Sequence, residues 1–250
     1  FKDNRFSICK MPRQSGKSTT VTGYMLWLIL FHDNQSIAIL ANKGSLARDM
    51  LAKIQLAYEH IPKWMQQGIV IWNKGNIELE NGSKILASAT SASAIRGGSY
   101  NLIFLDEFAF VPRNIAEEFF ASVYPTISSG KTSKIIVVST PNGLNHYYKM
   151  WVDATEKRSE YVPIEVHWRD TPGRDDKWRE QTIRNTSEEQ FKQEFETEFL
   201  GSTLTLISGS KLRSMAFKNV SRDAWGVDIY HQPEFKHTYA IMVDTGHGVG

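Results

Sequence analysis

Residues 5–19 read RFSICKMPRQSGKST, and this stretch decides the fold of the chain. Arg5–Lys10 is a short, mostly apolar run typical of a strand, and a helical pattern follows over Ser18–Leu30. The loop between them matches the phosphate-binding pattern G-x-x-x-x-G-K-[ST], except that Met11 occupies the position of the first glycine. A loop of this kind between a strand and a helix predicts a nucleotide-binding α/β fold.

The residue types in this loop suit a bound triphosphate. Backbone N–H groups of such a loop point toward the phosphates, and Gly16 lets the backbone approach closely. We expect Lys17 to reach the β- and γ-phosphates and the Ser18 hydroxyl to ligate Mg²⁺. Arg13 is an additional cation that either supports Lys17 or is a solvated loop charge; the alternative for the whole motif is a chance Gly-Lys-Ser at a helix start. The expected nucleotide-binding residues are Arg13, Gln14, Ser15, Gly16, Lys17, Ser18 and Thr19.

Short apolar runs alternate with helical patterns through the first two thirds of the sequence. Each run is nearly continuous in Ile, Leu, Val and Phe, as in strands that are buried on both faces of a parallel sheet. The alternation predicts a doubly wound α/β domain with a mainly parallel sheet. The expected strands are 5–10, 36–41, 84–89, 102–105 and 134–139, the expected helices are 18–30, 45–60 and 114–123, and a small hairpin is expected from 69–72 and 76–80.

Two carboxylates follow the strand expected at 102–105. Asp106 would hold Mg²⁺, usually through water, and Glu107 would orient and deprotonate an attacking water molecule. Functional groups in such sheets lie outside the carboxyl ends of the strands, where both Gly16 and Asp106 fall. The alternative is that Asp106 and Glu107 only cap the helix that follows.

A third strand end supplies hydroxyl groups at the same edge of the predicted sheet. It reads IIVVSTPNG over residues 135–143. A turn explains Pro141, Asn142 and Gly143, but it does not require Ser139 and Thr140.

Composition excludes several classes of protein. The 250 residues are 41% hydrophobic and 22% charged, which suits a globular protein with a buried core and argues against disorder, collagen and coiled coils. The longest apolar stretch, Tyr24–Phe31, is too short to cross a membrane. The single cysteine, Cys9, excludes an internal disulfide and a cysteine zinc site, and fits a reducing compartment. Because the net charge is only +2, any nucleic-acid surface must be a local patch.

The character of the sequence changes after about residue 159. Residues 174–184 and 187–198 are charged and amphipathic, which predicts two helices, the second capped by Ser187, with their charged faces in solvent. Residues 201–203 and 208–210 are expected to be hinges. We expect Trp168 to pack between subdomains, with DNA contact by His167, Trp168 and Arg169 as the alternative.

Four segments occur in the order PRQSGKS (12–18), AIRGGS (94–99), LDEFAFVP (105–112) and STPNG (139–143). As a set they resemble the large terminase subunit of tailed bacteriophages, nearest to the T-even-like myoviruses, over roughly residues 1–215. An Arg-Gln-x-Gly-Lys loop without the first glycine is typical of that family. The resemblance implies a RecA/ASCE-like P-loop NTPase core over 1–160, a small helical subdomain and hinge over 161–210, and the beginning of an RNase H-like nuclease domain over 211–250.

The resemblance also implies a function. The chain would be part of a motor that hydrolyses ATP, with Mg²⁺, to move double-stranded viral DNA into a procapsid. The implied partners are DNA, the portal protein, the small terminase subunit and further copies of the chain in a ring on the portal. The implied location is the host cytoplasm, transiently at the portal, without membrane association or secretion. The implied roles are nucleotide binding and catalysis for Lys17, transition-state stabilisation for Arg13, metal binding for Ser18 and Asp106, a base for Glu107, and coupling of hydrolysis to movement for Ser139, Thr140 and Pro141.

Three further expectations follow from the resemblance. Arg96 has a nucleotide- or DNA-responsive role or lies in a plain β-turn. A strand at 239–243 ends in Asp244, which resembles the first metal-binding acid of the nuclease or is a turn residue; one acid cannot clamp two metal ions, so no nuclease activity is expected of this chain. The family's adenine-contacting glutamine motif precedes the phosphate loop and lies upstream of residue 1, so weaker nucleotide binding is expected.

Two other functions remain open from the sequence. One is a superfamily-two helicase or another DNA translocase, and the other is a nucleotide-binding switch that is not a motor. Glu107 beside Asp106 favours hydrolysis, because a switch needs no strong base.

Overall fold

The computed structural model describes residues 1–91, 93–95, 97–129, 132–200, 221–222 and 228–229. The chain divides into two units, Phe1–Gly209 and Ser210–Gly250. In the second unit, β9 (Ser221–Arg222) and β10 (Asp228–Ile229) form an antiparallel pair. The strand expected at 239–243, Asp244, Arg96 and both expected hinges lie outside the described residues.

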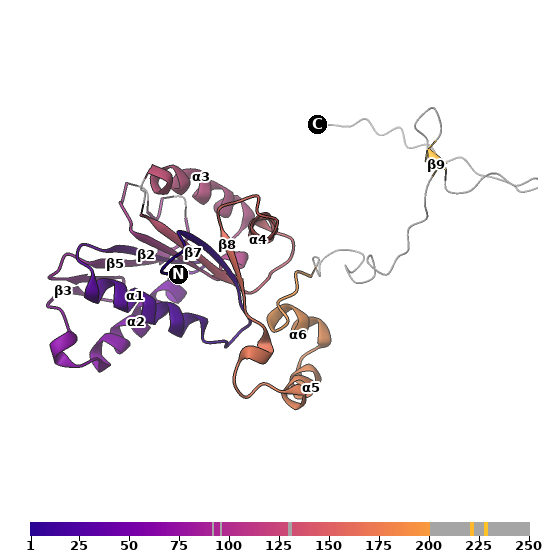
Figure 1. Ribbon diagram of the computed structural model, residues 1–250, viewed down its shortest axis with the longest axis horizontal. Coiled ribbons are helices and arrows are strands. Elements are labelled where there is room, and N and C mark those ends of the chain that lie inside the picture. The colour runs from indigo at the N-terminus through magenta and orange to yellow at the C-terminus, as the bar shows by residue number, and fades with distance from the viewer. Residues whose placement is uncertain (92, 96, 130–131, 201–220, 223–227, 230–250) are drawn as a thin grey trace, which may run out of the picture. The chain divides into compact units, whose positions relative to one another are not determined.

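The first unit contains an eight-stranded sheet in the order β3-β4-β5-β2-β6-β7-β1-β8 (Figure 1). The six strands from β5 to β8 in this order are parallel to one another, whereas β3 and β4 form an antiparallel hairpin that pairs antiparallel with β5 at one edge. This confirms the predicted mainly parallel sheet and the inserted hairpin. The strands are β1 (Phe6–Lys10), β2 (Ser36–Ala41), β3 (Ile69–Trp72), β4 (Asn76–Leu79), β5 (Lys84–Ala89), β6 (Leu102–Asp106), β7 (Lys134–Ser139) and β8 (Val162–Glu165).

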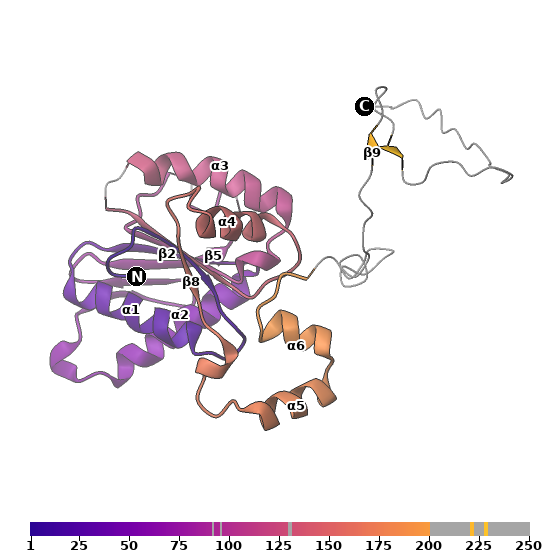
Figure 2. The same cartoon turned by 45° about the vertical axis from the view of Figure 1, so that its right-hand side comes forward.

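Helices cover both faces of this sheet, α1 and α2 on one face and α3 and α4 on the other (Figures 1 and 2). Successive residues of a strand point to opposite faces. Accordingly, Ile37 and Ile39 of β2 pack with α1 and α2, whereas Ala38 and Leu40 pack with α3 and α4. The helices are α1 (Lys17–Phe31), α2 (Gly44–His60), α3 (Arg113–Ser129) and α4 (His146–Thr155), with short 3-10 helices η1 (Lys63–Met65) and η2 (Phe108–Phe110).

The strand order brings the predicted site together. β7 lies between β1 and β6, and all three run parallel. Asp106 at the end of β6 is in register with Val138 of β7, which in turn pairs with Cys9 of β1. The phosphate loop, the acidic pair and the Ser139 strand end therefore leave the sheet at the same edge.

Within the described part of the first unit, the sequence patterns missed one strand, β8, and one α-helix, α4. β8 contains Pro163, which argues against a strand, but β8 lies at the sheet edge, where a missing N–H leaves no ladder bond unmade. α4 is only ten residues long and directly follows the Pro-Asn-Gly turn. Its signal was the N-cap Asn145, whose side chain accepts a hydrogen bond from the N–H of Tyr148 at 3.2 Å.

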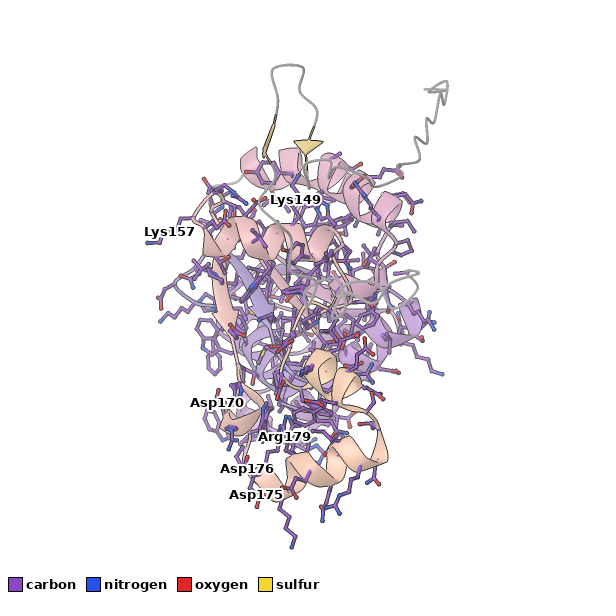
Figure 3. The ribbon with its side chains drawn as sticks, turned by 90° about the vertical axis from the view of Figure 1, so that its right-hand side faces the viewer. Lys149, Lys157, Asp170, Asp175, Asp176 and Arg179 are labelled. Carbon is purple, nitrogen blue, oxygen red and sulfur yellow. The ribbon has the colours of Figure 1, made fainter. Side chains whose placement is uncertain are left out.

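A small helical region follows β8 and packs around an aromatic cluster. It comprises η3 (Trp168–Asp170), α5 (Asp176–Asn185) and α6 (Glu188–Glu194), with Asp175, Asp176 and Arg179 on and beside α5 in Figure 3. The predicted cap is confirmed, since the Ser187 hydroxyl accepts from the Gln190 N–H at 3.0 Å, although α6 ends four residues before the expected 198. The aromatic cluster consists of Trp168, Trp178, Phe191 and Phe195. Trp168 is 2% exposed, so it is packed as expected, but its ring partners Trp178 and Phe191 belong to the helical region itself rather than to a second subdomain.

Over the part of the chain that the structure describes, we find no helix with the length and hydropathy needed to span a membrane.

Candidate nucleotide-binding site

The phosphate loop connects β1 to α1 and has two residues in the left-handed region. Gln14 has φ 54° and Gly16 has φ 81°. Gly16 is the N-cap residue of α1, and its carbonyl accepts the first helical hydrogen bond from the N–H of Thr20 at 3.0 Å. Glycine adopts this positive φ without the steric cost that a side chain would add. The first turn of α1 has neither an acidic residue nor a side-chain cap. Its N–H groups therefore suit an anionic ligand.

The Lys17 and Glu107 side chains meet directly. Lys17 Nζ lies 2.5 Å from Glu107 Oε1, and the Lys17 side chain is 10% exposed. Glu107 has φ 50° and ψ 40°, a left-handed conformation that is costly for a side-chain-bearing residue and is typical of functional sites. It occupies the N-cap position of η2, but its side chain makes no capping hydrogen bond. The geometry thus favours the predicted site over the alternative that Glu107 only caps a helix.

Asp106 lies at the carboxyl end of β6, and burial raises the pKa of its carboxyl group to about 6. The neighbouring Glu107 adds to the rise, whereas Lys17 and a hydrogen bond from the Glu107 N–H oppose it. Asp106 Oδ1 accepts that N–H at 3.1 Å, which fixes the carboxylate beside the loop.

These groups fit Mg²⁺ carried by a nucleotide. A buried carboxylate that is costly to ionise is stabilised when a cation binds beside it. Among the described residues, no cluster of three or more His, Cys, Asp or Glu side chains could hold a metal on its own. Mg²⁺ commonly binds one or two carboxylates together with substrate phosphates, so Asp106 would supply one ligand to a Mg²⁺ ion that arrives with a nucleotide.

Lys17 and Glu107 both line a pocket of about 380 Å³. Two oxygen atoms among its lining residues, Asn42 Oδ1 and Glu107 Oε2, are buried and have no hydrogen-bond partner within the described chain. The sequence analysis missed Asn42. It follows β2, whose last residue, Ala41, pairs with Asp106, so a polar residue directly after this neighbouring strand was the available signal. The pocket is lined by Arg13, Gln14, Lys17, Asn42, Leu46, Glu107 and Phe110.

The strand end at Ser139 is hydrogen-bonded both to the phosphate loop and to the segment that follows Glu107. Ser139 Oγ accepts the N–H of Ala109 at 3.1 Å, and its carbonyl accepts the N–H of Met11 at 3.2 Å. The buried Thr140 hydroxyl has no partner among the described residues, and the Pro141 carbonyl accepts from the Gln193 side chain of α6 at 3.2 Å. Residues 139–141 therefore contact the phosphate loop, the segment after Glu107 and the helical region.

The helical region contacts the phosphate loop directly through Arg174 and Glu194, which depart from the expectation of a solvated charged helix face, whereas Lys177, Glu180, Glu188 and Glu189 are exposed as expected. Arg13 Nε lies 2.7 Å from a carboxylate oxygen of Glu194, whose side chain is 13% exposed, and the Arg13 N–H donates to the Glu194 carbonyl at 3.0 Å. Arg174 donates from Nη2 to the carbonyls of Arg13 and Gln14 at 2.7 and 3.0 Å. The sequence missed these contacts because the residues are 161 and 160 positions apart.

The remaining predicted loop residues divide between two places. Ser15 Oγ donates to the Pro12 carbonyl at 2.8 Å, a bond within the loop. Ser18 lies half-buried in the first turn of α1. Thr19 lines a different pocket of about 300 Å³ between α1 and α2, so the structure does not bring it to the pocket of Lys17 and Glu107.

Solved structures of large terminases share this fold. The ATPase domain of the large terminase of Thermus phage P74-26 superposes with a TM-score of 0.64 at 17% identity, covering 79% of this chain and 90% of that one. The large terminase of a thermophilic bacteriophage, solved in complex with ADP, gives 0.60 at 14% identity, covering 79% and 49%. These likenesses confirm the predicted P-loop ATPase fold.

The sequence comparisons agree. The large terminase subunit of Escherichia phage T5 is 30% identical over 206 residues, which are 78% of this chain. The chain spans 44% of the length of that relative. The family described as the N-terminal part of T4likevirus-type terminase large subunits matches residues 8–214. The resemblance seen in the four motifs is thereby confirmed, and the chain belongs to the T4likevirus-type terminase large subunit family.

Proposed function

We propose that this chain is the ATP-hydrolysing part of a motor that moves double-stranded DNA into a viral procapsid. The observation that carries the proposal is the contact between Lys17 of the phosphate loop and Glu107 at the end of β6. A cation for the phosphates and a carboxylate base at one sheet edge are the parts that phosphoryl transfer to water requires.

Nucleotide binding exchanges the partner of Lys17. The amides around Gly16 receive the phosphates, and the triphosphate attracts Lys17 away from Glu107. Glu107 then loses its cation and becomes free to accept a proton from water. The nucleotide-free protein thus keeps its base paired with Lys17 until a triphosphate is present.

The orphaned oxygens suit an attacking water molecule. A water between Glu107 Oε2 and Asn42 Oδ1 can donate one proton to each, which directs its lone pair toward the γ-phosphorus. Glu107 takes the first proton as the water oxygen bonds to the γ-phosphorus, and Asn42 accepts a hydrogen bond from the second proton. The bond between the γ-phosphorus and the bridging oxygen breaks at the same time, and ADP leaves with that electron pair.

The other predicted residues have supporting roles. Ser18 and Asp106 hold Mg²⁺, which neutralises charge on the phosphate oxygens when it is bound. Arg13 supports the same charge once it turns from Glu194 to the phosphates. Residues 139–141 couple the site to the helical region, with which they share the Gln193 hydrogen bond.

The assigned partners follow from the family. They are double-stranded DNA, the portal protein, the small terminase subunit and further copies of this chain in a ring. We propose that the protein acts in the host cytoplasm and at the portal.

The test is DNA-stimulated ATP hydrolysis by full-length protein carrying Glu107→Gln. We expect turnover to fall by at least about 100-fold, as for loss of a general base, while an ATP analogue still binds. Glu117→Gln is the matched control, because Glu117 is an exposed carboxylate on α3 that pairs with Arg113 of the same helix. Wild-type turnover in Glu107→Gln would refute the assignment of the base.

A further inference from the structure

Arg174 lies in the turn before α5, outside the residues assigned to nucleotide chemistry. Its Nη2 atom donates to two consecutive carbonyl oxygens of the phosphate loop, those of Arg13 at 2.7 Å and Gln14 at 3.0 Å. Hydrogen bonds from a charged donor are about twice as strong as neutral ones. One side chain thus restrains two adjacent peptide groups of the loop.

These bonds determine where the loop amides point. In a trans peptide, the C=O of one residue and the N–H of the next point in opposite directions. When Arg174 holds the carbonyls of Arg13 and Gln14, the N–H groups of Gln14 and Ser15 face away from it, as amides that bind phosphate must. Gln14 also has φ 54°, a conformation that needs support from its surroundings.

The guanidinium itself is fixed by the aromatic cluster. It lies 4.8 Å from the ring centroid of Trp178 and 5.4 Å from that of Phe195. Stacking on aromatic rings orients a planar guanidinium and leaves its edge free to donate. The restraint on the loop therefore originates in the helical region rather than in the sheet.

We propose that Arg174 is a positioning residue for the nucleotide: it holds the loop carbonyls so that the adjacent amides face the phosphates. This role of Arg174 rests on the proposed nucleotide site. It implies that the helical region must contact the phosphate loop for the nucleotide to bind tightly. If the helical region moves away from the phosphate loop, the carbonyls of Arg13 and Gln14 lose their donor and nucleotide binding weakens.

The test measures the Kd of a non-hydrolysable ATP analogue with Mg²⁺, and the KM and kcat of hydrolysis, in full-length protein. Arg174→Met keeps an apolar side chain against the aromatic rings but removes the donors. The matched control is Arg179→Met, because Arg179 also stacks in the cluster, 5.3 Å from the ring centroid of Phe191, and pairs with Glu196 rather than with the loop. Arg174→Lys restores a charged donor.

We expect Arg174→Met to raise the Kd and the KM about tenfold, as for loss of charged hydrogen bonds, with a smaller change in kcat. Arg174→Lys should recover part of the affinity, and Arg179→Met should stay within about twofold of wild type. Equal Kd values in Arg174→Met and Arg179→Met, with binding abolished in Lys17→Ala, would overturn the role of Arg174 alone. Unchanged binding in Lys17→Ala would overturn the nucleotide site itself. If Arg174→Met does not fold, a Kd for Arg174→Lys weaker than wild type supports the proposal, and an unchanged Kd overturns it.

Discussion

Replacing Asp106 with asparagine should make the nucleotide-free protein more stable while abolishing hydrolysis. Asparagine has nearly the same shape and keeps an oxygen that can accept the Glu107 N–H, now 3.1 Å from Asp106 Oδ1. What it removes is a negative charge that burial makes costly. Residues selected for chemistry at the expense of stability behave in this way.

The magnitude follows from the pKa of Asp106, raised from 3.8 to about 6. Each unit corresponds to 1.36 kcal/mol, so ionised Asp106 destabilises the folded state by at most about 3 kcal/mol. Because the pKa is raised on folding, the folded state binds the Asp106 proton more tightly than the unfolded state does. The protonated carboxyl group therefore adds its full free energy of stabilisation below pH 3.8, and this stabilisation is lost as pH rises through about 6. The advantage of Asp106→Asn should therefore be full at pH 8, about half at pH 5, and near zero below pH 4.

The assay is urea unfolding of full-length protein without nucleotide and with a chelator, at pH 8 and pH 5. A gain of ~3 kcal/mol in the free energy of unfolding raises the urea midpoint, and in a parallel thermal unfolding experiment it raises the Tm by roughly 6–12 °C for a domain of this size. Asp49→Asn is the control, because Asp49 is exposed on α2, and it should change stability by less than about 0.5 kcal/mol at both pH values. Equal stabilities of wild type and Asp106→Asn at pH 8 would refute the electrostatic reasoning.

Four other predictions concern the same edge of the sheet. Asn42→Ala should lower kcat by about tenfold or more with little change in analogue Kd, measured by steady-state kinetics and calorimetry; equal kcat values would exclude Asn42 as a water-orienting group. Ser139→Ala should lower the unfolding free energy by about 1–3 kcal/mol, because the buried Ala109 N–H loses its acceptor, and an unaltered urea midpoint would contradict this. Lys17→Ala should abolish analogue binding while circular dichroism remains that of a folded protein. The apparent affinity for Mg²⁺ together with an ATP analogue should weaken as pH falls through about 6, because the proton and the cation compete for Asp106, and equal affinities at pH 5 and pH 8 would argue against Asp106 as the metal-holding group.

The sequence predicted the elements whose signals are local. The strands at 36–41, 84–89 and 134–139 occur with the expected bounds. For 36–41 and 134–139 the reason is that a strand buried on both faces must be apolar at nearly every position. The placement of the phosphate loop and the acidic pair at one edge was predicted too, since the carboxyl ends of parallel strands share one edge, whereas the direct ion pair between Lys17 and Glu107 was not. In contrast, β8 carries Pro163 and is mostly exposed, so no apolar run marked it.

The contacts of the helical region were beyond sequence reasoning for a different reason. Arg174 and Glu194 belong to charged stretches that look like solvated surfaces, and only the folded chain brings them to the phosphate loop. Asn42 is an intermediate case, because strand order was needed to place it beside Glu107. Local patterns predict elements, whereas partners far apart in sequence depend on how those elements pack.

Met11 occupies the position of the first glycine in the phosphate-loop pattern, and its conformation bears on how phosphate loops are recognised in other sequences. Met11 packs against the hydrophobic core with a negative φ and continues the β1 pairing through its N–H, so nothing at this position calls for glycine. The unusual backbone conformations fall instead on Gln14 and Gly16. A search template that demands glycine at the first position would overlook this chain. A template built on dihedral angles, or one that fixes only Gly-Lys-Ser after a buried strand, would retrieve it.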